Sequence, residues 1–188
     1  MHANPDATCP FGTRYGTRVK NLVLIGFMGT GKSAVGRKVA QRLGRSFIDL
    51  DERIEAREGQ AIAEIFRAKG EPYFRDVESA VIAEAAVQGG VVIATGGGAV
   101  LRPQNVERLK ANGLLICLRA DAATIAKRVS RKPSRPLLAG EGDLRERVER
   151  LLAQRAPAYA VADVTIDSDD HPVARVVEEV LCHAKLLG

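Results

Sequence analysis

The segment GFMGTGKS at residues 26–33 constrains this chain more than any other feature of its sequence. It fits the pattern G-x-x-x-x-G-K-[ST], in which backbone amides surround the phosphates of a nucleotide. The apolar run LVLI at 22–25 precedes it and is typical of a buried parallel strand. After it, Val35, Val39 and Leu43 recur every four residues, which predicts a helix. The segment therefore lies between a strand and a helix, which is the context that a phosphate-binding loop requires.

Each residue type in this loop has a chemical reason to be there. We predict that Gly26, Gly29 and Gly31 take backbone conformations that residues with a Cβ avoid, and that they turn amides toward an anion at the positive end of a helix. Lys32 is predicted to reach the β- and γ-phosphates, and the Ser33 hydroxyl to bind Mg²⁺. The ATP-binding residues predicted in this segment are Gly29, Thr30, Gly31, Lys32, Ser33 and Ala34.

Two other interpretations fit the same letters. A glycine turn between a strand and a helix needs no ligand, but it gives no reason for Lys32 and Ser33 in register. Residues 29–34 also satisfy the looser dinucleotide pattern G-x-G-x-x-[GA], and acids follow about 20 residues later, as that fold requires. That pattern does not call for the longer loop or for its Lys-Ser pair. We therefore favour a triphosphate ligand.

Length and charge limit the class of protein. The chain has 188 residues, of which 46% are hydrophobic and 27% charged, and this is typical of one soluble globular domain. No apolar run approaches the roughly 18 residues that a membrane span needs, so we expect no membrane partner. The net charge of +5 attracts polyanions of any kind, but the basic residues are dispersed and no aromatic-studded strand accompanies them. We therefore expect no nucleic-acid partner.

The first part of the chain differs from the rest. Residues 1–20 are rich in Pro, Gly and Thr and show no apolar period, so we expect a disordered extension ahead of a domain at 21–188. This extension lacks the apolar core of a secretory signal. We therefore expect the protein in the cytoplasm.

Two acids end the second expected strand. FIDLD at 47–51 reads as a strand that terminates in Asp49 and Asp51, whose side chains would point the same way on an extended backbone. Carboxylates at this end of a strand, beside a phosphate loop, lie where open α/β sheets bind ligands. One of them could help to hold Mg²⁺, and the other could accept a proton from an attacking hydroxyl. The alternative is that both acids cap a helix that begins near Glu52.

Arg75 stands at an unusual position for a cation. Helical pieces broken at Gly59 precede it, and a helix is predicted to begin near Pro72 and to bury Phe74. Arg75 would then occupy the first turn, where the helix dipole disfavours positive charge. A bidentate grip on a carboxylate would explain this position, and solvated surface would equally fit the spacing.

Further along, two segments suggest contacts with a ligand. Gly96, Gly97 and Gly98 follow the expected strand at 91–94, and three glycines expose more backbone than a simple turn requires, although a flexible turn is the alternative. The loop at 131–142 is dense in Pro, Gly and cations, which suits a lid over phosphates.

Taken in order, these segments resemble the shikimate kinase family over residues 21 to about 185. The matching segments are GFMGTGKS at 26–33, DLD at 49–51, GEPYFRDVE at 70–78, TGGGAV at 95–100, RPLL at 135–138 and RAPAY at 155–159. The resemblance implies a P-loop, nucleoside-monophosphate-kinase-like α/β fold in three layers, with a five-stranded parallel sheet flanked by helices. It also implies a substrate-binding segment at about 51–80 and a mobile lid at about 131–142.

The resemblance implies an activity as well. This is ATP-dependent phosphorylation of the 3-hydroxyl of shikimate, a step toward chorismate and the aromatic amino acids, with ATP and shikimate as the small-molecule partners of a monomer. On the nucleotide side, Lys32 would hold the β- and γ-phosphates, and Ser33 and, through water, Asp49 would place Mg²⁺. The other nucleotide contacts that it implies are Arg128 and Pro172, near the adenine, and Arg135, at the γ-phosphate.

On the side of the acid, the resemblance implies that Asp51 binds the ring hydroxyls and orients or deprotonates the nucleophile. Arg75 and Arg155 would grip the carboxylate, and the amides of Gly96, Gly97 and Gly98 would line the other side of the ring. The catalytic residues would then be Lys32, Asp51 and Arg135. Because phosphoryl transfer proceeds by positioning and charge neutralisation, we expect no covalent enzyme intermediate.

Two further functions are compatible with parts of the sequence. A related small-metabolite kinase, such as a gluconate kinase, would share the phosphate loop, but the three glycines and the two carboxylate-binding arginines favour shikimate. A regulatory module that keeps the nucleotide site without catalysis and binds nucleic acid through its basic surface would not need Lys32, Asp51 and Arg135 together.

Overall fold

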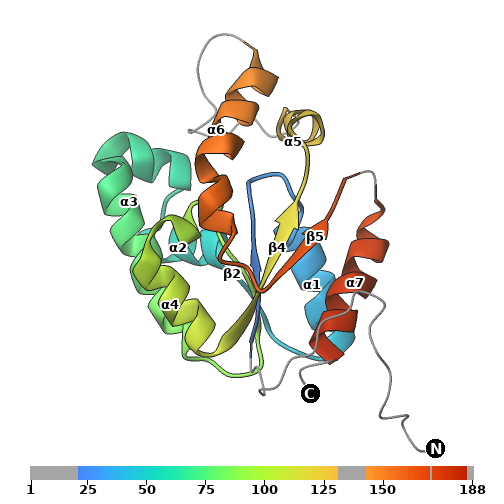
Figure 1. The fold of residues 1–188 in the computed structure, drawn as a ribbon. Coiled ribbons are helices and arrows are strands. Elements are labelled where there is room, and N and C mark those ends of the chain that lie inside the picture. Colours follow the sequence, from blue (N-terminus) through green and yellow to red (C-terminus); the bar gives the residue numbers. More distant parts are fainter. Residues whose placement is uncertain (1–20, 131–142, 170, 186–188) are drawn as a thin grey trace, which may run out of the picture.

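The computed structural model describes residues 21–130, 143–169 and 171–185 (Figure 1). The extension expected at 1–20 lies outside the described residues. The same is true of the lid expected at 131–142, and therefore of Arg135.

A parallel sheet of five strands, in the order β2-β3-β1-β4-β5, forms the centre of the molecule. The strands are β1 Asn21–Ile25, β2 Phe47–Asp49, β3 Val92–Ala94, β4 Gly113–Arg119 and β5 Val164–Asp167. In the register of β1, Leu24 lies between Ala94 of β3 and Ile116 of β4. The strands read as continuous apolar runs because helices cover both faces of the sheet. The predicted five-stranded parallel sheet is confirmed.

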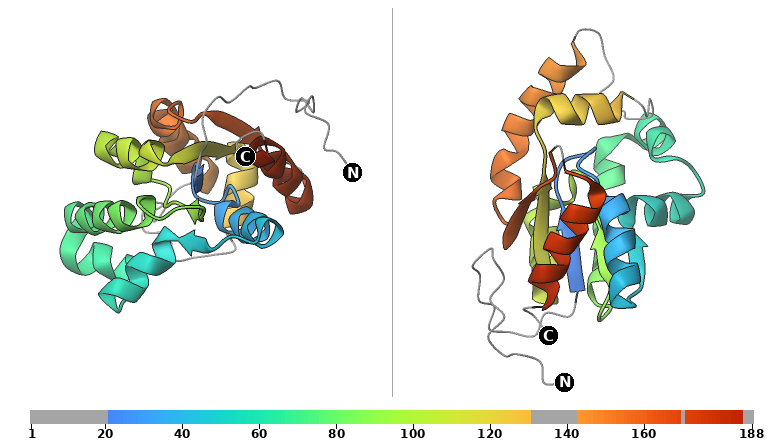
Figure 2. Two further views of the ribbon diagram at one scale, coloured as in Figure 1. Left: turned by 90° about the horizontal axis from the view of Figure 1, so that it is seen from below. Right: turned by 90° about the vertical axis from the view of Figure 1, so that its right-hand side faces the viewer.

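Helices form the two outer layers and also lie beyond the carboxyl ends of the strands. Their bounds are α1 Lys32–Leu43, α2 Leu50–Glu58, α3 Ile62–Ala86, α4 Pro103–Ala111, α5 Ala122–Val129, α6 Leu144–Tyr159 and α7 Val173–Lys185, with a 3₁₀ turn, η1, at Ala99–Leu101. Helices α1 and α7 lie side by side on one face, and α2, α3 and α4 lie on the other (Figure 2). Helices α5 and α6 lie beyond the carboxyl ends of the strands (Figure 1).

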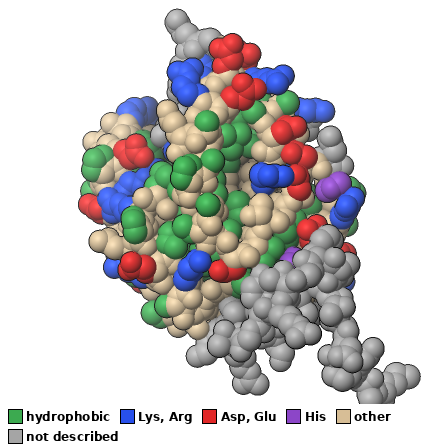
Figure 3. All heavy atoms as spheres, viewed as in Figure 1, with side chains coloured by type: hydrophobic (Ala, Val, Ile, Leu, Met, Phe, Trp, Pro, Cys, Tyr) green, Lys and Arg blue, Asp and Glu red, His purple; other side chains and the backbone are tan. Residues whose placement is uncertain are grey.

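Alternating side chains of β1 supply both halves of the core. Val23 and Ile25 pack against α2, α3 and α4, whereas Leu22 and Leu24 pack against α1 and α7. This is the two-residue period of an extended strand buried on both faces. A third cluster, around Phe27, fastens α5 and α6 to the phosphate loop. No helix in the described ranges combines the length and apolar character that crossing a bilayer would need. On the face shown in Figure 3, basic and acidic side chains are interspersed.

The second strand is shorter than the sequence predicts. It ends at Asp49, and α2 begins at Leu50, so Asp51 lies in the first turn of a helix. The Asp49 carboxylate accepts a hydrogen bond from the Asp51 backbone N–H at 3.1 Å and caps this helix. The prediction that both acids point the same way from one extended strand is therefore wrong. Capping wins because it satisfies an amide that has no partner within the helix.

Glycines set the shape of the α2–α3 region. Gly59 caps α2 with φ 67°, as the break predicted there requires, and α3 kinks at Gly70, where φ is 78° and ψ 171°. Pro72 follows the kink, so the second half of α3 begins where the sequence predicts a helix start. Helix α4, which starts with Pro103, was not predicted.

Candidate active site

The phosphate loop joins β1 to α1 and has the backbone that its glycines predict. Gly26, Gly29 and Gly31 have φ values of 132°, 83° and 97°, so all three occupy the region that residues with a Cβ rarely adopt. At Gly26 a side chain would also collide with the carbonyl oxygen of Leu118 on β4. The loop can therefore lie directly against the sheet only with glycine at this position.

Lys32, the first residue of α1, lies along this loop. Its side chain is buried, and Nζ donates to the carbonyl oxygens of Gly26 and Phe27, each at 2.8 Å. The Thr30 hydroxyl donates to the same Phe27 carbonyl at 2.8 Å. These hydrogen bonds fold the loop back on itself at the N-terminus of a helix. Such a loop is suited to binding an anion.

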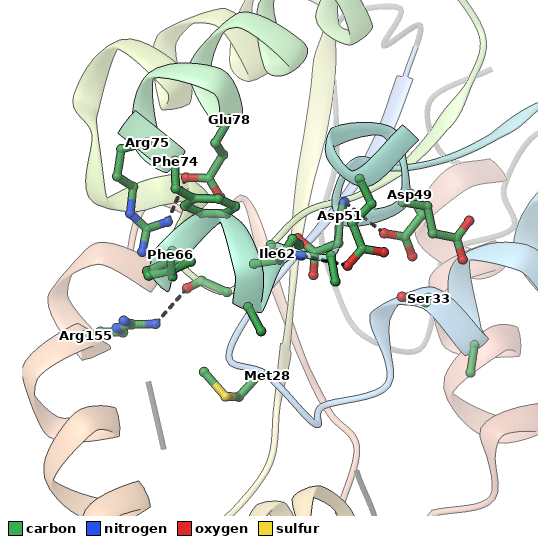
Figure 4. A pocket seen from close by; sticks show the side chains of 18 of the residues that line it. Met28, Ser33, Asp49, Asp51, Ile62, Phe66, Phe74, Arg75, Glu78 and Arg155 are labelled. Carbon is green, nitrogen blue, oxygen red and sulfur yellow. Dashed lines mark hydrogen bonds and ion pairs between the residues drawn. The ribbon is translucent and has the colours of Figure 1, made fainter. Parts of the chain in front are cut away.

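A cavity of about 660 Å³ opens beside the loop (Figure 4). It brings together eight of the residues predicted for the substrate and the metal, together with Ala34 of the ATP-binding set; the eight are Ser33, Asp49, Asp51, Arg75, Gly96, Gly97, Gly98 and Arg155. These residues come from α1, β2, α2, α3, α6 and the loop after β3. Segments far apart in the chain therefore build one site at the carboxyl end of the sheet, as expected for an open α/β fold.

Arg75 lies at one end of this cavity, where it pairs with two carboxylates. Its Nη1 donates to Glu78 Oε2 at 2.7 Å, and its Nε and Nη2 donate to Glu71 Oε1 at 3.1 and 2.9 Å. The Arg75 side chain is 8% exposed and that of Glu78 only 1%. Burial raises the pKa of Glu78 above its ordinary value, although the Arg75 charge works against this shift. The guanidinium is thus held in one orientation.

Arg155 projects into the same end of the cavity from α6. Figure 4 shows the two guanidinium groups of Arg75 and Arg155 on one side and the Asp49, Asp51 and Ser33 side chains on the other. Arg155 is buried, lies over the Phe27 ring at 5.8 Å, and its Nη1 is 3.5 Å from the Gly97 carbonyl oxygen. Two guanidinium groups, with Glu78 beside Arg75, therefore lie at one end of the cavity, and Asp49, Asp51 and Ser33 lie toward the other.

The three consecutive glycines are explained by the side chains packed against them. A Cβ on Gly96 would lie 2.8 Å from Asp51 Oδ1 and 2.9 Å from Glu78 Oε1. A Cβ on Gly98 would collide with both terminal nitrogens of Arg75. The glycines thus let a carboxylate and a guanidinium approach the backbone closely, which a flexible turn would not require.

Apolar side chains form one wall of the cavity. Met28, Ile62, Phe66 and Phe74 line it, and the Phe66 and Phe74 rings pack with their centroids 4.6 Å apart. A small ring with a carboxylate at one end and hydroxyl groups at the other would match these surfaces.

Oxygen donors for a metal lie at the loop end of the cavity. Ser33 is exposed there. Asp49 also lines this end, and its Oδ1 accepts a hydrogen bond from the Asp51 backbone N–H. Within the described ranges no three His, Cys, Asp or Glu side chains cluster as a metal site would. A hydroxyl with one carboxylate suits Mg²⁺, which usually takes few protein ligands and completes its shell with phosphate and water.

Two residues predicted for the adenine lie outside this cavity. Arg128, on α5, donates to the Ser168 carbonyl at 2.8 Å and reaches the Gly29 carbonyl at 3.4 Å, so it lies against the phosphate loop. Pro172 is exposed just before α7. Arg128 is therefore near the loop, and the contact of either residue with a base stays a prediction.

Sequence reasoning missed several residues that shape the site. Glu78 and Tyr159 lie within the segments GEPYFRDVE and RAPAY, yet neither received a role. Helical spacing could have found both, because Glu78 follows Arg75 by three residues and Tyr159 follows Arg155 by four, which places each pair on one helix face. Phe66 carries no comparable signal, because its place in the wall depends on the kink in α3.

Known proteins resemble this chain over most of its length. The family model for shikimate kinase matches residues 28–185. The shikimate kinase of Caldanaerobacter subterraneus is 47% identical over 171 residues, which are 90% of this chain and 99% of that protein. The shikimate kinase from Acinetobacter baumannii, solved in complex with shikimate, superposes with a TM-score of 0.85 at 36% identity, covering 89% of this chain and 93% of that one. A gluconokinase from Sinorhizobium meliloti reaches a TM-score of 0.59 at 22% identity, covering 92% and 95%, so it shares the fold alone.

Proposed function

The chain belongs to the shikimate kinase family, and from this premise we propose how its residues transfer phosphate from ATP to the 3-hydroxyl of shikimate. The observation that carries the proposal is a cavity beside the phosphate loop, with Arg75 and Arg155 at one end and Asp51 toward the other. This layout matches a ring acid whose hydroxyl must face a triphosphate.

We assign the phosphates of ATP to the loop between β1 and α1. Its positive-φ glycines turn backbone amides inward, and α1 points its positive end at the same place. The Gly26 and Phe27 carbonyls align the Lys32 ammonium along the loop, where it would meet the β- and γ-phosphates as a positive charge. Arg128 and Pro172 would contact the base, and Arg135 the γ-phosphate.

Ser33 and Asp49 are the residues that would hold Mg²⁺. Both line the cavity next to the loop, and both offer the oxygen donors that this ion prefers. When bound, Mg²⁺ neutralises charge on the β- and γ-phosphates.

The carboxylate of shikimate would bind between Arg75 and Arg155. Glu71 and Glu78 already orient the Arg75 guanidinium, so the Arg75 side chain loses little conformational entropy when the acid binds. Phe66 and its neighbours in the apolar wall would pack on the carbon ring. The two arginines thus set the direction in which the hydroxyls point.

Asp51 would act on the attacking hydroxyl. Its carboxylate lies against Gly96, at the end of the cavity away from the arginines. We propose that it accepts a hydrogen bond from the 3-hydroxyl and aligns its oxygen with the γ-phosphorus, and that the hydroxyl proton passes to it or is lost to solvent as the new P–O bond forms. The phosphoryl group moves directly, so the bond to ADP breaks without a covalent enzyme intermediate.

We also propose that the segment at about 51–80 binds the acid and that the enzyme works as a cytoplasmic monomer. In support of a monomer, the cavity combines cationic, acidic and apolar surfaces from one chain. Gel filtration at assay concentration would test this.

A coupled assay for ADP release tests the function. The enzyme with Mg²⁺ and ATP should release ADP slowly, and addition of shikimate should stimulate release strongly. Release that shikimate leaves unchanged would overturn the proposal, and stimulation by gluconate instead would favour the related kinases.

A further inference from the structure

Tyr159, the last residue of α6, makes a hydrogen bond that none of the roles above uses. Its hydroxyl donates to the carbonyl oxygen of Gly97 at 2.6 Å, although the two residues are 62 positions apart in the sequence. Gly97 is the middle residue of the glycine loop that lines the cavity. The bond therefore fixes a ligand-lining loop to a helix that lies beyond the carboxyl ends of the strands.

The position of Tyr159 is itself fixed from several sides. Its ring packs against the core cluster beneath α3 and α4 and against the cluster beneath α5 and α6. Burial raises the pKa of its hydroxyl to about 12, so this group stays protonated and remains a donor at any working pH. Because Tyr159 follows Arg155 by four residues, one helix face delivers both side chains to the glycine loop.

The bond determines how one peptide group is turned. In a trans peptide, the carbonyl of Gly97 and the N–H of Gly98 point in opposite directions, and the structure contains no cis peptide among its described residues. When Tyr159 holds the carbonyl toward α6, the Gly98 N–H must point away from α6. Among the described residues, no hydrogen bond uses that N–H. Gly98 itself lines the cavity, so an amide that points away from α6 can meet a bound molecule there.

We propose that Tyr159 is a positioning residue for the acid substrate: by holding the Gly97 carbonyl toward α6, its hydroxyl keeps the Gly98 amide turned away from α6 and toward the bound ring acid. Three glycines in a row have no side chains to limit their rotation, so this loop needs an external restraint. The inference deepens the proposed function and rests on it.

Tyr159→Phe tests the inference, because it keeps the ring and its packing and removes only the hydroxyl that bonds the Gly97 carbonyl. The KM for shikimate should rise about fivefold, the size expected for loss of one hydrogen bond, while the KM for ATP should change less than twofold. Isothermal titration of shikimate in the presence of ADP should show the same loss of affinity. A merely structural role would lower the melting temperature and affect both substrates alike.

Tyr73→Phe is the matched control. Tyr73 lies on the exposed side of α3, where its hydroxyl bonds Glu58 and Lys69, and its removal should leave both KM values unchanged. As a rescue, 4-aminophenylalanine at position 159 restores a donor on the same ring and should return the shikimate KM most of the way to the original value.

The outcomes separate the two levels of the proposal. If shikimate does not stimulate the unmodified enzyme, the proposed function fails. If it does, and Tyr159→Phe has an unchanged shikimate KM or loses affinity for both substrates equally, only the role of Tyr159 is overturned. Failure of 4-aminophenylalanine to rescue would also contradict it, because the donor and the ring would both be present.

Discussion

Arg75 and Glu78 form an ion pair, with Nη1 and Oε2 2.7 Å apart, at the wall of the cavity and almost out of contact with water. They are three positions apart in sequence, so a single helical turn of α3 positions both the proposed substrate-binding cation and the carboxylate that holds it. Because the pair is buried at the cavity wall, a change to either residue should alter both the stability of the fold and the orientation of the Arg75 guanidinium.

Replacement of Glu78 should therefore change how stability depends on pH. Because burial raises the pKa of Glu78 above the unfolded value of 4.5, the folded state holds the proton more tightly than the unfolded state does. Proton binding by Glu78 therefore adds to the free energy of unfolding. This addition is fully present below pH 4.5 and is lost as the pH rises through the pKa of Glu78 in the folded state. The free energy of unfolding of the unmodified protein minus that of Glu78→Gln should thus fall between pH 4 and pH 8. Urea denaturation across this range measures it, and a difference that rises with pH would contradict the assigned direction.

Arg75→Lys should raise the KM for shikimate by about tenfold with little effect on the KM for ATP. An ammonium cannot reproduce the fork that contacts Glu78, Glu71 and an incoming carboxylate at once. Arg67→Lys, at an exposed position earlier on α3, is the control and should behave as the original enzyme. An unchanged shikimate KM in Arg75→Lys would remove Arg75 from the site.

Gly98→Ala should weaken shikimate binding through Arg75. The backbone at Gly98 has φ −108°, which alanine tolerates, so the damage comes from the Cβ that would collide with the guanidinium. We expect a shikimate KM raised by about tenfold or more, on the scale of a lost charge-assisted contact, with ATP binding retained. Steady-state kinetics with each substrate varied in turn checks this, and equal losses for both substrates would point to general disruption instead.

Asp51→Asn should leave ATP binding nearly intact and lower turnover by about a hundredfold or more, because only the alignment and deprotonation of the hydroxyl are lost. Titration calorimetry with ATP and single-turnover kinetics separate the two effects. Abolished ATP binding would contradict the role given to Asp51.

The fold was largely predictable because its signals are local. The apolar run before Gly26, the spacing of Val35 and Val39, and the breaks at Gly59 and Gly70 each act within a few residues. Helix α4 escaped prediction. The β2 boundary was misplaced because capping by Asp49 ended the strand, and two acids alone do not show which of them caps.

The residues that line the cavity were predictable where a motif or a resemblance named them, and not where two partners meet only through the fold; their roles stay predictions. The helix position of Arg75 suggested that it binds a carboxylate, but its spacing fitted a solvent-exposed side chain equally well. The structure shows Arg75 buried at the wall of the cavity. The bond between Tyr159 and Gly97 joins residues 62 positions apart, and no local pattern carries that information.

The central claim is that one cavity holds the ring acid and the triphosphate side by side. A crystal structure with ADP, Mg²⁺ and shikimate tests it most directly. We predict the shikimate carboxylate between Arg75 and Arg155, the 3-hydroxyl on Asp51, and the ADP phosphates on the loop at Lys32. Shikimate bound away from Arg75 and Arg155, or with its 3-hydroxyl facing away from the phosphates, would contradict the account.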